Sequence, residues 1–529
     1  MSRIVRLRPW QKAAFDRFVT SAGDDFLAVA TPGAGKTTFA LTAARHQLAE
    51  RPGRLIVVAP TAHLKRQWAE AAAAFALHLD PAWSAADGEL PRDMHGIVTS
   101  YQQVATSART LQRLSRGAFV VFDELHHAAD DRAWGEAVRD AFDGAARRLA
   151  LSGTPFRSDT RAIPFVRYAG DEAVPDYEYG YGDALADRRV VRPVYFPRTN
   201  GQMEWTAPDG RVHAATFDDH LDAELASQRL RTALSLAGEW LPTVLRAAHA
   251  RLVEVRREQP NAGGLVIATD QEHARGIAAI IRDRLRAPVR IVTSDDPNAS
   301  AGIAAFAASA EPWLVAVRMV SEGVDIPRLR VGVYATTTTT ELFFRQAVGR
   351  LVRWTRGVPR QRAWLFIPDD PRLRTHAASV QEQRRHSLRR AERDEREERE
   401  DETNVDDVQM SLFAVISAVA TGAIESAADE DWELDEGGAE EVELALAPPP
   451  PLAGGGNLGV VTRTRTEEKR DLRDANASVA RELVRRTPLT HAQVNAELNR
   501  LSGVRKVSEA TIEQLERRLA AADRWLAKT

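Results

Sequence analysis

The segment Phe26–Thr38 places the strongest constraint on how this chain can fold. An apolar run from Phe26 to Ala30 predicts a buried strand, the Gly and Pro residues after it predict a turn, and the residues from Thr37 onward favour a helix. A glycine-rich turn between a strand and a helix N-terminus directs backbone N–H groups at an anion, and the helix dipole favours negative charge there. The segment therefore predicts a phosphate-binding loop within an α/β fold.

The residues of this loop have separate expected roles. Lys36 can reach the β- and γ-phosphates of a nucleotide, and the Thr37 hydroxyl is placed to bind Mg²⁺. The strict form of the motif has a glycine where this chain has Ala30, and the alternative is an ordinary turn that carries a surface lysine. The flanking strand and helix favour a nucleotide site. The other loop residues expected to contact the nucleotide are Pro32, Gly33, Ala34, Gly35 and Thr38.

Composition limits the compartment and the partners that we expect. The 71 Lys and Arg residues nearly balance 74 Asp and Glu residues, so any contact with nucleic acid needs a local basic patch. The chain has no cysteine, which excludes disulfides and thiolate metal sites and fits a reducing compartment. The N-terminus lacks an apolar signal core, and no apolar run reaches membrane-spanning length. We therefore expect a cytoplasmic protein without membrane contact.

Several predicted strands end in polar residues. Apolar runs that alternate with helical stretches predict a parallel, doubly wound sheet, whose ligands gather at the carboxyl ends of the strands. The polar residues that follow these runs should therefore lie at one edge, beside the phosphate-binding loop. The runs cover Leu55–Ala59, Gly96–Tyr101, Ala118–Phe122 and Arg148–Leu151.

An acidic pair, Asp123 and Glu124, follows one of these runs. A carboxylate directly after a buried strand can hold Mg²⁺, and its neighbour can orient and deprotonate the attacking water. We assign Asp123 to the metal and Glu124 to the water. An ordinary acidic strand end is the alternative, but the upstream loop and His126 favour the catalytic interpretation. A zinc site at His126 and His127 is not expected, because adjacent histidines point apart.

The full set of motifs resembles superfamily 2 helicases. It is most similar to the branch that holds the XPB-like and RadD-like DNA translocases and the motor subunits of type I and III restriction enzymes. The resemblance spans about residues 8–368, with Leu125 in place of the more usual alanine of the DEAH box. The motifs that carry it are Arg8–Gln11, Ala30–Thr37, Ala59–Thr61, Thr99–Gln102, Asp123–His126 and Ser152–Arg157.

The resemblance implies an α/β fold of two tandem RecA-like parallel-sheet lobes with an ATP cleft between them. Beyond the resemblance, composition and capping signals predict a charged linker and then a C-terminal α-helical module. Gln11, just before the loop, is expected to read the adenine edge. Some residues are expected to couple nucleotide contacts to nucleic-acid binding. They are His126, Ser152 and Thr154, and in the second lobe Gly323 and Asp325. Residues expected to contact nucleic acid are Thr61, Thr99, Thr269 and Ser321. A cap at a helix start is the alternative for each threonine.

A predicted helix in the second lobe carries two arginines. Gln346, Gly349, Arg350 and Arg353 are spaced at i, i+3, i+4 and i+7 and would share one face of this helix. Gln346 is expected at the nucleotide. A guanidinium pair can neutralise charge on the transferring γ-phosphoryl group. The alternative is a basic surface stripe.

We expect five segments: a first lobe at 1–160, an inter-lobe segment at 161–260, a second lobe at 261–370, a charged linker at 371–461 and a helical tail at 462–529. Gln202–Thr206 and Arg211–Ala215 predict a hairpin, either a strand-separating pin or surface decoration. Within the linker, Met410–Ala420 predicts a short apolar helix. The tail is either a DNA-binding module of helix-turn-helix type or a protein-docking bundle.

These features together predict an ATP- and Mg²⁺-dependent DNA helicase or translocase. One alternative is the motor subunit of a restriction or defence complex, with a separate nuclease or methylase bound through the C-terminal third. A replication or repair protein could bind there instead. Another alternative is an RNA helicase or a nucleotide-gated nucleic-acid-binding protein. Comparing ATPase stimulation by duplex DNA, single strands and RNA separates these alternatives.

Overall fold

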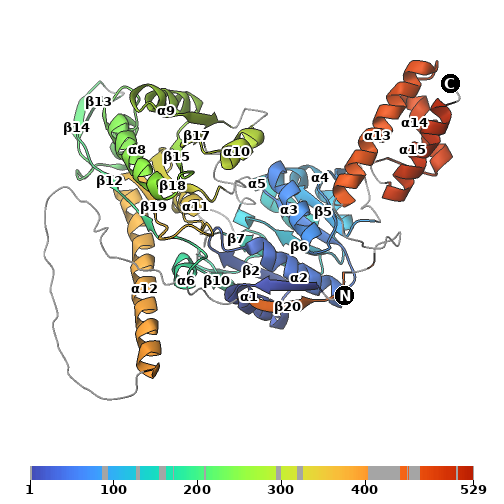
Figure 1. Cartoon of the computed structure of the whole chain (residues 1–529), viewed down its shortest axis with the longest axis horizontal. Helices are drawn as coiled ribbons and strands as arrows, with labels where there is room; N and C mark the ends of the chain where they lie inside the picture. The colour runs from blue at the N-terminus through green and yellow to red at the C-terminus, as the bar shows by residue number, and fades with distance from the viewer. Residues whose placement is uncertain are drawn as a thin grey trace. The chain divides into compact units, whose positions relative to one another are not determined.

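The computed structural model describes the following residues of the 529-residue chain: 3–85, 93–126, 132–153, 163–170, 172–207, 210–293, 299–317, 326–402, 441–449, 451, 465–507 and 510–527. The chain divides into two compact units (Figure 1). The first comprises Met1–Val29, Gly35–Glu178 and Glu440–Thr529, and the second comprises Ala30–Ala34 and Tyr179–Ala439. In the described ranges no helix is long and apolar enough to cross a membrane.

A seven-stranded sheet forms the centre of the first unit, in the order β10-β2-β7-β6-β3-β5-β4. The strands from β2 to β4 in this order pair in parallel. Their side chains are almost entirely buried, as expected for short apolar runs covered on both faces. The strands are β2 (Asp25–Ala30), β3 (Leu55–Ala59), β4 (Leu79–Asp80), β5 (Gly96–Ser100), β6 (Phe119–Phe122), β7 (Arg147–Ser152) and β10 (Tyr177–Tyr179).

Helices of the first unit connect these strands, as parallel pairing requires. They are α1 (Pro9–Thr20), α2 (Lys36–Glu50), α3 (Ala62–Ala74), α4 (Tyr101–Leu114) and α5 (Arg132–Phe142). Trp10, Phe15 and Phe18 form the buried side of α1. A short antiparallel pair, β8 (Tyr168–Ala169) and β9 (Glu172–Ala173), follows the main sheet.

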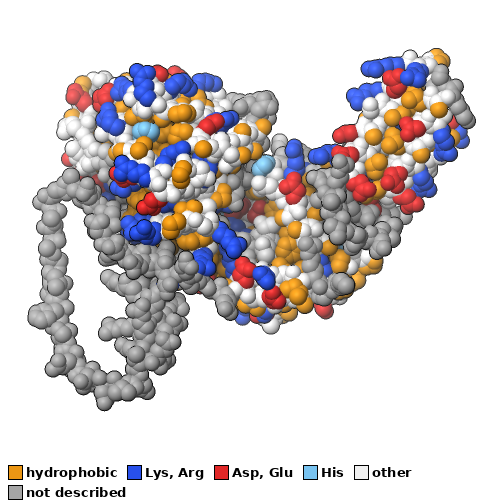
Figure 2. Space-filling view, in the orientation of Figure 1, with side chains coloured by type: hydrophobic (Ala, Val, Ile, Leu, Met, Phe, Trp, Pro, Cys, Tyr) orange, Lys and Arg blue, Asp and Glu red, His pale blue; other side chains and the backbone are white. Residues whose placement is uncertain are grey.

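The C-terminal residues of the chain also belong to the first unit. β20 (Val442–Leu446) pairs antiparallel with β1 (Arg3–Leu7), which the acidic composition of the region did not predict. The tail forms α13 (Arg465–Arg486), α14 (His491–Ser502) and α15 (Ile512–Leu526). Thr490 and Gln493 form a capping box at the start of α14. Figure 2 shows basic and acidic side chains interspersed on these helices rather than one continuous basic face.

A second parallel sheet forms the centre of the second unit, in the order β11-β19-β18-β15-β17-β16, and β12 also pairs with β19. Every described pairing in this sheet is parallel. The strands are β11 (Val194–Tyr195), β12 (Arg198–Thr199), β15 (Gly263–Ala268), β16 (Val289–Val292), β17 (Trp313–Val317), β18 (Leu329–Ala335) and β19 (Ala363–Pro368). The predicted α/β class, with two parallel sheets and C-terminal helices, is thus confirmed.

Helices and a hairpin complete the second unit. The predicted hairpin is present as β13 (Met203–Thr206) paired with β14 (Val212–Ala215). The predicted helix Met410–Ala420 lies outside the described residues. The helices are α6 (Tyr181–Ala186), α7 (Ala223–Ala233), α8 (Trp240–Glu258), α9 (Gln271–Arg284), α10 (Ala299–Ala308), α11 (Glu341–Leu351) and α12 (Pro371–Glu402).

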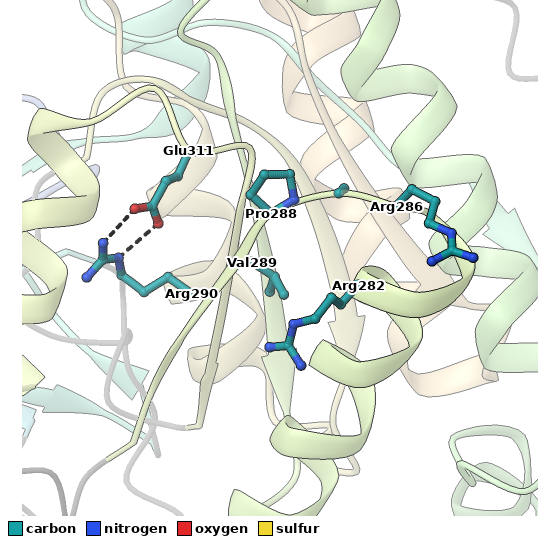
Figure 3. Close-up of a pocket in the computed structure, with 7 residues that line it drawn as sticks. Arg282, Arg286, Pro288, Val289, Arg290 and Glu311 are labelled. Atoms are coloured by element: carbon teal, nitrogen blue, oxygen red, sulfur yellow. Dashed lines mark hydrogen bonds and ion pairs between the residues drawn. The ribbon is translucent and has the colours of Figure 1, made fainter.

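A pocket of about 650 Å³ lies in the second unit where α9 ends and β16 begins (Figure 3). Arg290 pairs with Glu311 through hydrogen bonds of 2.9 and 2.5 Å, and Arg282 and Arg286 add exposed positive charge to the lining. The pocket lies at the amino ends of the parallel strands. Ligands of such sheets bind at the carboxyl ends, and the pocket contains no residue predicted for the nucleotide site.

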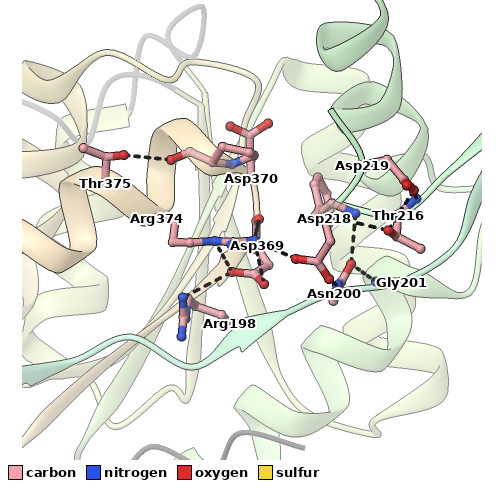
Figure 4. A network of polar contacts seen from close by, with 12 residues as sticks. Arg198, Asn200, Gly201, Thr216, Asp218, Asp219, Asp369, Asp370, Arg374 and Thr375 are labelled. Atoms are coloured by element: carbon pink, nitrogen blue, oxygen red, sulfur yellow. Dashed lines mark hydrogen bonds and ion pairs between the residues drawn. The ribbon is translucent and has the colours of Figure 1, made fainter. Parts of the chain in front are cut away.

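A polar network attaches the start of α12 to the segment around the hairpin (Figure 4). The Arg374 guanidinium reaches Asp369 at 3.1 Å and Asp218 at 3.2 Å. Asp218 also accepts a hydrogen bond of 2.6 Å from the Asn200 amide. Arg198 lies 3.6 Å from Asp369 on the other side. These contacts connect the residues that flank the hairpin to the start of α12 at several points, so the hairpin has a fixed base.

Candidate nucleotide site

The loop between β2 and α2 has the backbone conformation that its glycines permit. Gly33 and Gly35 have φ angles of +84° and +93°, a region that residues with a Cβ rarely adopt. The Ala34 N–H donates to the Thr31 carbonyl at 3.1 Å, which closes the turn. Lys36 is the first residue of α2, and Thr37 and Thr38 follow in its first turn. The predicted order of strand, glycine turn and helix N-terminus is therefore present. Contact of this loop, Pro32 included, with a nucleotide stays a prediction.

Substituting Gly35 by alanine tests this conformation. The left-handed backbone would cost about 1–2 kcal/mol with a Cβ present. The new Cβ would also lie 2.6 Å from Gln11 Nε2, so that side chain must move. We expect a correspondingly lower free energy of unfolding, measured by thermal or chemical denaturation. Gly23→Ala is the control, because its Cβ would meet no atom closer than 3.5 Å. Equal stability of the two variants would contradict the prediction.

Gln11 lies against the loop, as its position before it suggests. Its Nε2 donates to the Gly35 carbonyl at 2.9 Å, and its Oε1 accepts from the Arg8 backbone N–H at 2.8 Å. The side chain is 3% exposed. A primary amide retains one further donor and one further acceptor site after two such bonds. Recognition of adenine by Gln11 stays a prediction, and it would have to use those remaining sites.

Lys36 and Glu124 come together although 88 residues separate them. Lys36 Nζ donates to Glu124 Oε1 at 2.8 Å, and the Gly153 N–H donates to Oε2 at 2.8 Å. The side chains are 12% and 24% exposed. Burial alone would raise the pKa of Glu124, but Lys36, His126 and the Gly153 N–H outweigh it and lower the pKa to about 2. The carboxylate is therefore ionised at neutral pH and held at a defined position.

Glu124 also has an unusual backbone. Its φ angle is +49°, in the left-handed region that costs free energy for a residue with a Cβ. Residues held in such conformations concentrate at functional sites, where surrounding contacts fix them. The contacts with Lys36 and Gly153 supply that constraint here. The sequence gives no signal for this conformation.

Asp123 is oriented by two aromatic residues that the sequence analysis missed. Trp68 Nε1 donates to Asp123 Oδ2 at 2.8 Å, and the Tyr101 hydroxyl donates to the Asp123 carbonyl at 2.9 Å. Asp123 is 9% exposed. A carboxylate and the Thr37 hydroxyl are oxygen donors, which suit Mg²⁺ together with water and phosphate ligands. The predicted metal ligands therefore have suitable chemistry.

The predicted coupling residues lie close to Glu124. His126 Nδ1 is 3.6 Å from Glu124 Oε2 and 3.5 Å from the Ser152 hydroxyl. Ser152 is buried at the end of β7. These contacts place the ends of β6 and β7 at one edge, as the parallel topology predicts. Thr154 lies outside the described residues, as does His127.

The arginine helix of the second unit ends earlier than its sequence suggests. α11 ends at Leu351, so Gln346, Gly349 and Arg350 lie on it, whereas Arg353 lies beyond it. The prediction that Arg353 shares a helical face is therefore wrong. Arg353 instead forms an isolated antiparallel bridge with Val191, and this pairing replaces the next helical turn. Gly323 and Asp325 lie outside the described residues.

The predicted nucleic-acid contacts have mixed outcomes. The Thr61 hydroxyl accepts from the Leu64 N–H at 3.4 Å, as a helix cap does. Thr99 is fully buried and donates to Gln103 at 3.2 Å, so its hydroxyl is not at the surface and that assignment is wrong. The Thr269 hydroxyl donates to the Ala335 carbonyl at 3.4 Å and stays a candidate. Ser321 lies outside the described residues.

Part of the chain is similar to a known family. Residues 4–157 match the family described as "Type III restriction enzyme, res subunit". This match confirms the resemblance to the restriction-enzyme branch of superfamily 2 helicases. The matched range contains the phosphate-binding loop, Asp123 and Glu124.

Relatives are known from mycobacteria. The chain is 47% identical over 397 residues to the uncharacterized protein Rv2917 of Mycobacterium tuberculosis, which covers 73% of this chain and 65% of that protein. It is 46% identical over 397 residues to the uncharacterized protein ML1624 of Mycobacterium leprae, again covering 73% of this chain and 66% of that protein. The chain thus spans about two thirds of the length of these relatives.

Among solved structures, the chain is similar to a putative HsdR subunit of a type I restriction enzyme from Vibrio vulnificus. The identity is 17% and the TM-score 0.48, covering 70% of this chain and 65% of that chain. It is also similar to Dbp5 of S. cerevisiae bound to RNA and ADP BeF3. There the identity is 13% and the TM-score 0.45, covering 72% of this chain and 88% of that chain.

Proposed function

We propose that this chain, whose residues 4–157 match the res subunit of type III restriction enzymes, is an ATP- and Mg²⁺-dependent motor that moves on DNA. The observation that carries the proposal is the ion pair between Lys36 and Glu124, at 2.8 Å, beside a glycine-rich loop and a helix N-terminus. A phosphate-binding cation and a water-activating carboxylate are the two groups that hydrolysis of a nucleoside triphosphate needs first.

The ion pair suggests how substrate binding prepares the base. Lys36 stabilises the ionised form of Glu124, whose pKa is lowered to about 2. A carboxylate with so low a pKa is a weak general base. Triphosphate oxygens would compete for the Lys36 ammonium, and Glu124 would then lose its strongest cationic partner. Its pKa would rise, and it could accept a proton from the attacking water more readily.

The other residues have supporting roles in the proposal. The loop N–H groups and Lys36 would bind the phosphates, and Gln11 would contact adenine. Thr37 and Asp123 would hold Mg²⁺, which supplies positive charge that stabilises the phosphates. Arg350 and Arg353 of the second unit would stabilise the transferring phosphoryl group, and Gln346, Gly323 and Asp325 would contact the nucleotide. Repeated binding and hydrolysis would then drive movement along a nucleic-acid backbone.

Steady-state ATP hydrolysis tests the proposal. The purified chain is measured without polymer and then with duplex DNA, single-stranded DNA and RNA. We expect stimulation by DNA and little by RNA, because the 2′-hydroxyl groups and the A-form geometry of RNA allow a protein to distinguish the two polymers. Stimulation by RNA alone would favour an RNA helicase instead. An ATPase rate that none of these nucleic acids changes would contradict the proposal of a motor.

The match to a restriction-enzyme res subunit favours a second, narrower candidate. In it, the chain is the motor subunit of a restriction or defence complex, and a separate nuclease or methylase binds the C-terminal third. The purified chain would then hydrolyse ATP on DNA and leave the DNA uncut. Gel analysis of the DNA after turnover checks this, and cleavage by the chain alone would contradict it.

A further inference from the structure

Arg192 is a fully buried arginine in the second unit, on the chain that leads into β11. Its Nη2 donates to the Pro327 carbonyl at 2.7 Å, to the Arg353 carbonyl and to the Thr355 hydroxyl at 3.1 Å. Its backbone N–H donates to the Val352 carbonyl at 2.7 Å. Arg192 therefore contacts two segments that lie far apart in the sequence.

Both segments matter for the proposed chemistry. Pro327 lies two residues after Asp325 and four after Gly323 in the sequence. Arg353 is one of the two arginines assigned to the γ-phosphoryl group. The Thr355 hydroxyl also donates to the Pro327 carbonyl at 3.1 Å, so the two segments share a second bond beside Arg192. Gln361 fixes Thr355 in turn, because its amide accepts from the Thr355 N–H at 3.0 Å.

Burying the Arg192 guanidinium costs free energy, so a role in fixing the local geometry is needed to explain it. In the described part of the chain, the side-chain acceptors of Arg192 are carbonyls and one hydroxyl, with no carboxylate among them. Burial, with Arg330 nearby, lowers the pKa of Arg192. A buried cation without an anion contributes little to stability, but the planar guanidinium fixes several acceptors in one geometry. A lysine ammonium is a single point of charge and cannot span the same set.

We propose that Arg192 is a positioning residue for ATP hydrolysis. It holds the backbone at Arg353 and at Pro327 in one arrangement, so that the Arg353 guanidinium is presented to the γ-phosphoryl group. The inference rests on the proposed function. Because α11 ends before Arg353, the helix itself does not fix that residue, and Arg192 with the Val191 bridge takes over this role.

Three variants test the inference by steady-state kinetics, with binding of a fluorescent ATP analogue and thermal unfolding measured alongside. Arg192→Lys keeps the positive charge but loses the planar set of guanidinium N–H donors. Arg192→Met removes the charge. Thr355→Val removes the shared hydroxyl near the surface and is not expected to prevent folding. We expect Arg192→Lys to lower kcat about 10- to 100-fold, because small displacements of catalytic groups have effects of that size. Binding of the analogue should change less than about twofold.

Arg229 provides a matched control in the same unit. It is 1% exposed, and it donates to the carbonyls of Thr216 and Asp219 at 2.5 and 2.9 Å. Neither acceptor belongs to the proposed site. Arg229→Lys should therefore lower thermal stability as Arg192→Lys does and leave kcat within about twofold of the parent chain.

The outcomes separate the inference from the proposed function. A parent chain without ATPase activity overturns both. An active parent chain with equal losses of kcat in the Arg192→Lys and Arg229→Lys variants overturns the inference alone, since the role is then structural. Unchanged kcat in Arg192→Lys and Thr355→Val also overturns it. Should Arg192→Met fail to fold, the lysine and Thr355 variants still decide the matter.

Discussion

Replacing Glu124 by glutamine should reduce ATP hydrolysis by about 10²- to 10⁴-fold, the usual contribution of a general base. Glutamine keeps the size of the side chain but cannot accept a proton from water. Its amide can accept from only one of the two donors that now contact the carboxylate, Lys36 and the Gly153 N–H. Turnover is measured with saturating ATP, with and without DNA. Binding of a nucleotide analogue should persist, because the phosphate-binding loop is unchanged.

Two further variants make this result specific. Lys36→Ala should abolish hydrolysis and also weaken nucleotide binding, since it removes the cation expected at the phosphates. Asp25→Asn is the control: Asp25 pairs with Arg148 at the opposite end of β2, away from the loop, and should leave turnover unchanged. DNA-stimulated turnover retained in Glu124→Gln or Lys36→Ala would overturn the assignment of both residues.

The first lobe could be predicted from local pattern. Each buried strand is a short apolar run, and the polar residues at the carboxyl end of a strand follow that run directly. Parallel topology then brings Asp123, Ser152 and the loop to one edge of the sheet. The Lys36–Glu124 contact joins two predicted site residues for that reason. Periodicity and turn chemistry are local properties, so a single sequence contains them.

Contacts between distant segments could not be predicted in this way. Trp68 orients Asp123 from another helix, and no spacing rule connects the two positions. The helix pattern continues to Arg353, but pairing with Val191 ends the helix first, so tertiary contact overrides propensity. The strand β20 pairs with β1 across most of the chain length, and its acidic composition favoured a linker. Each of these features depends on where a distant segment of the same chain lies. The local sequence pattern carries no information about that position.

A buried carboxylate, Asp93, contacts two of the C-terminal helices. Asp93 Oδ1 accepts from Lys469 Nζ at 2.8 Å, and Oδ2 accepts from the Ile512 N–H at 3.0 Å. Asp93 and Lys469 are each 1% exposed. Burial lowers the pKa of Lys469, and Asp93 opposes that effect. The carboxylate thus fixes the first turns of α13 and α15 to the segment before β5.

Lys469→Met should destabilise this attachment by about 3–5 kcal/mol, because it removes the ammonium group that pairs with the buried Asp93 carboxylate. Hydrogen exchange of α13 and α15, together with denaturant unfolding, measures the loss. Arg470→Met is the matched control. Arg470 is the next residue, 65% exposed and 3.8 Å from Asp471, and it should change stability by less than about 0.5 kcal/mol.

The double variant Asp93→Leu with Lys469→Met identifies the cause. Apolar side chains of similar size remove the uncompensated charge, so much of the lost stability should return. The three helices also have a core of their own, formed by Leu483, Val494, Leu498 and Ala522. Protection within that core should persist in Lys469→Met while the first turns of α13 and α15 exchange faster. Equal loss at both places would mean that Asp93 supports the fold of the helices rather than their attachment.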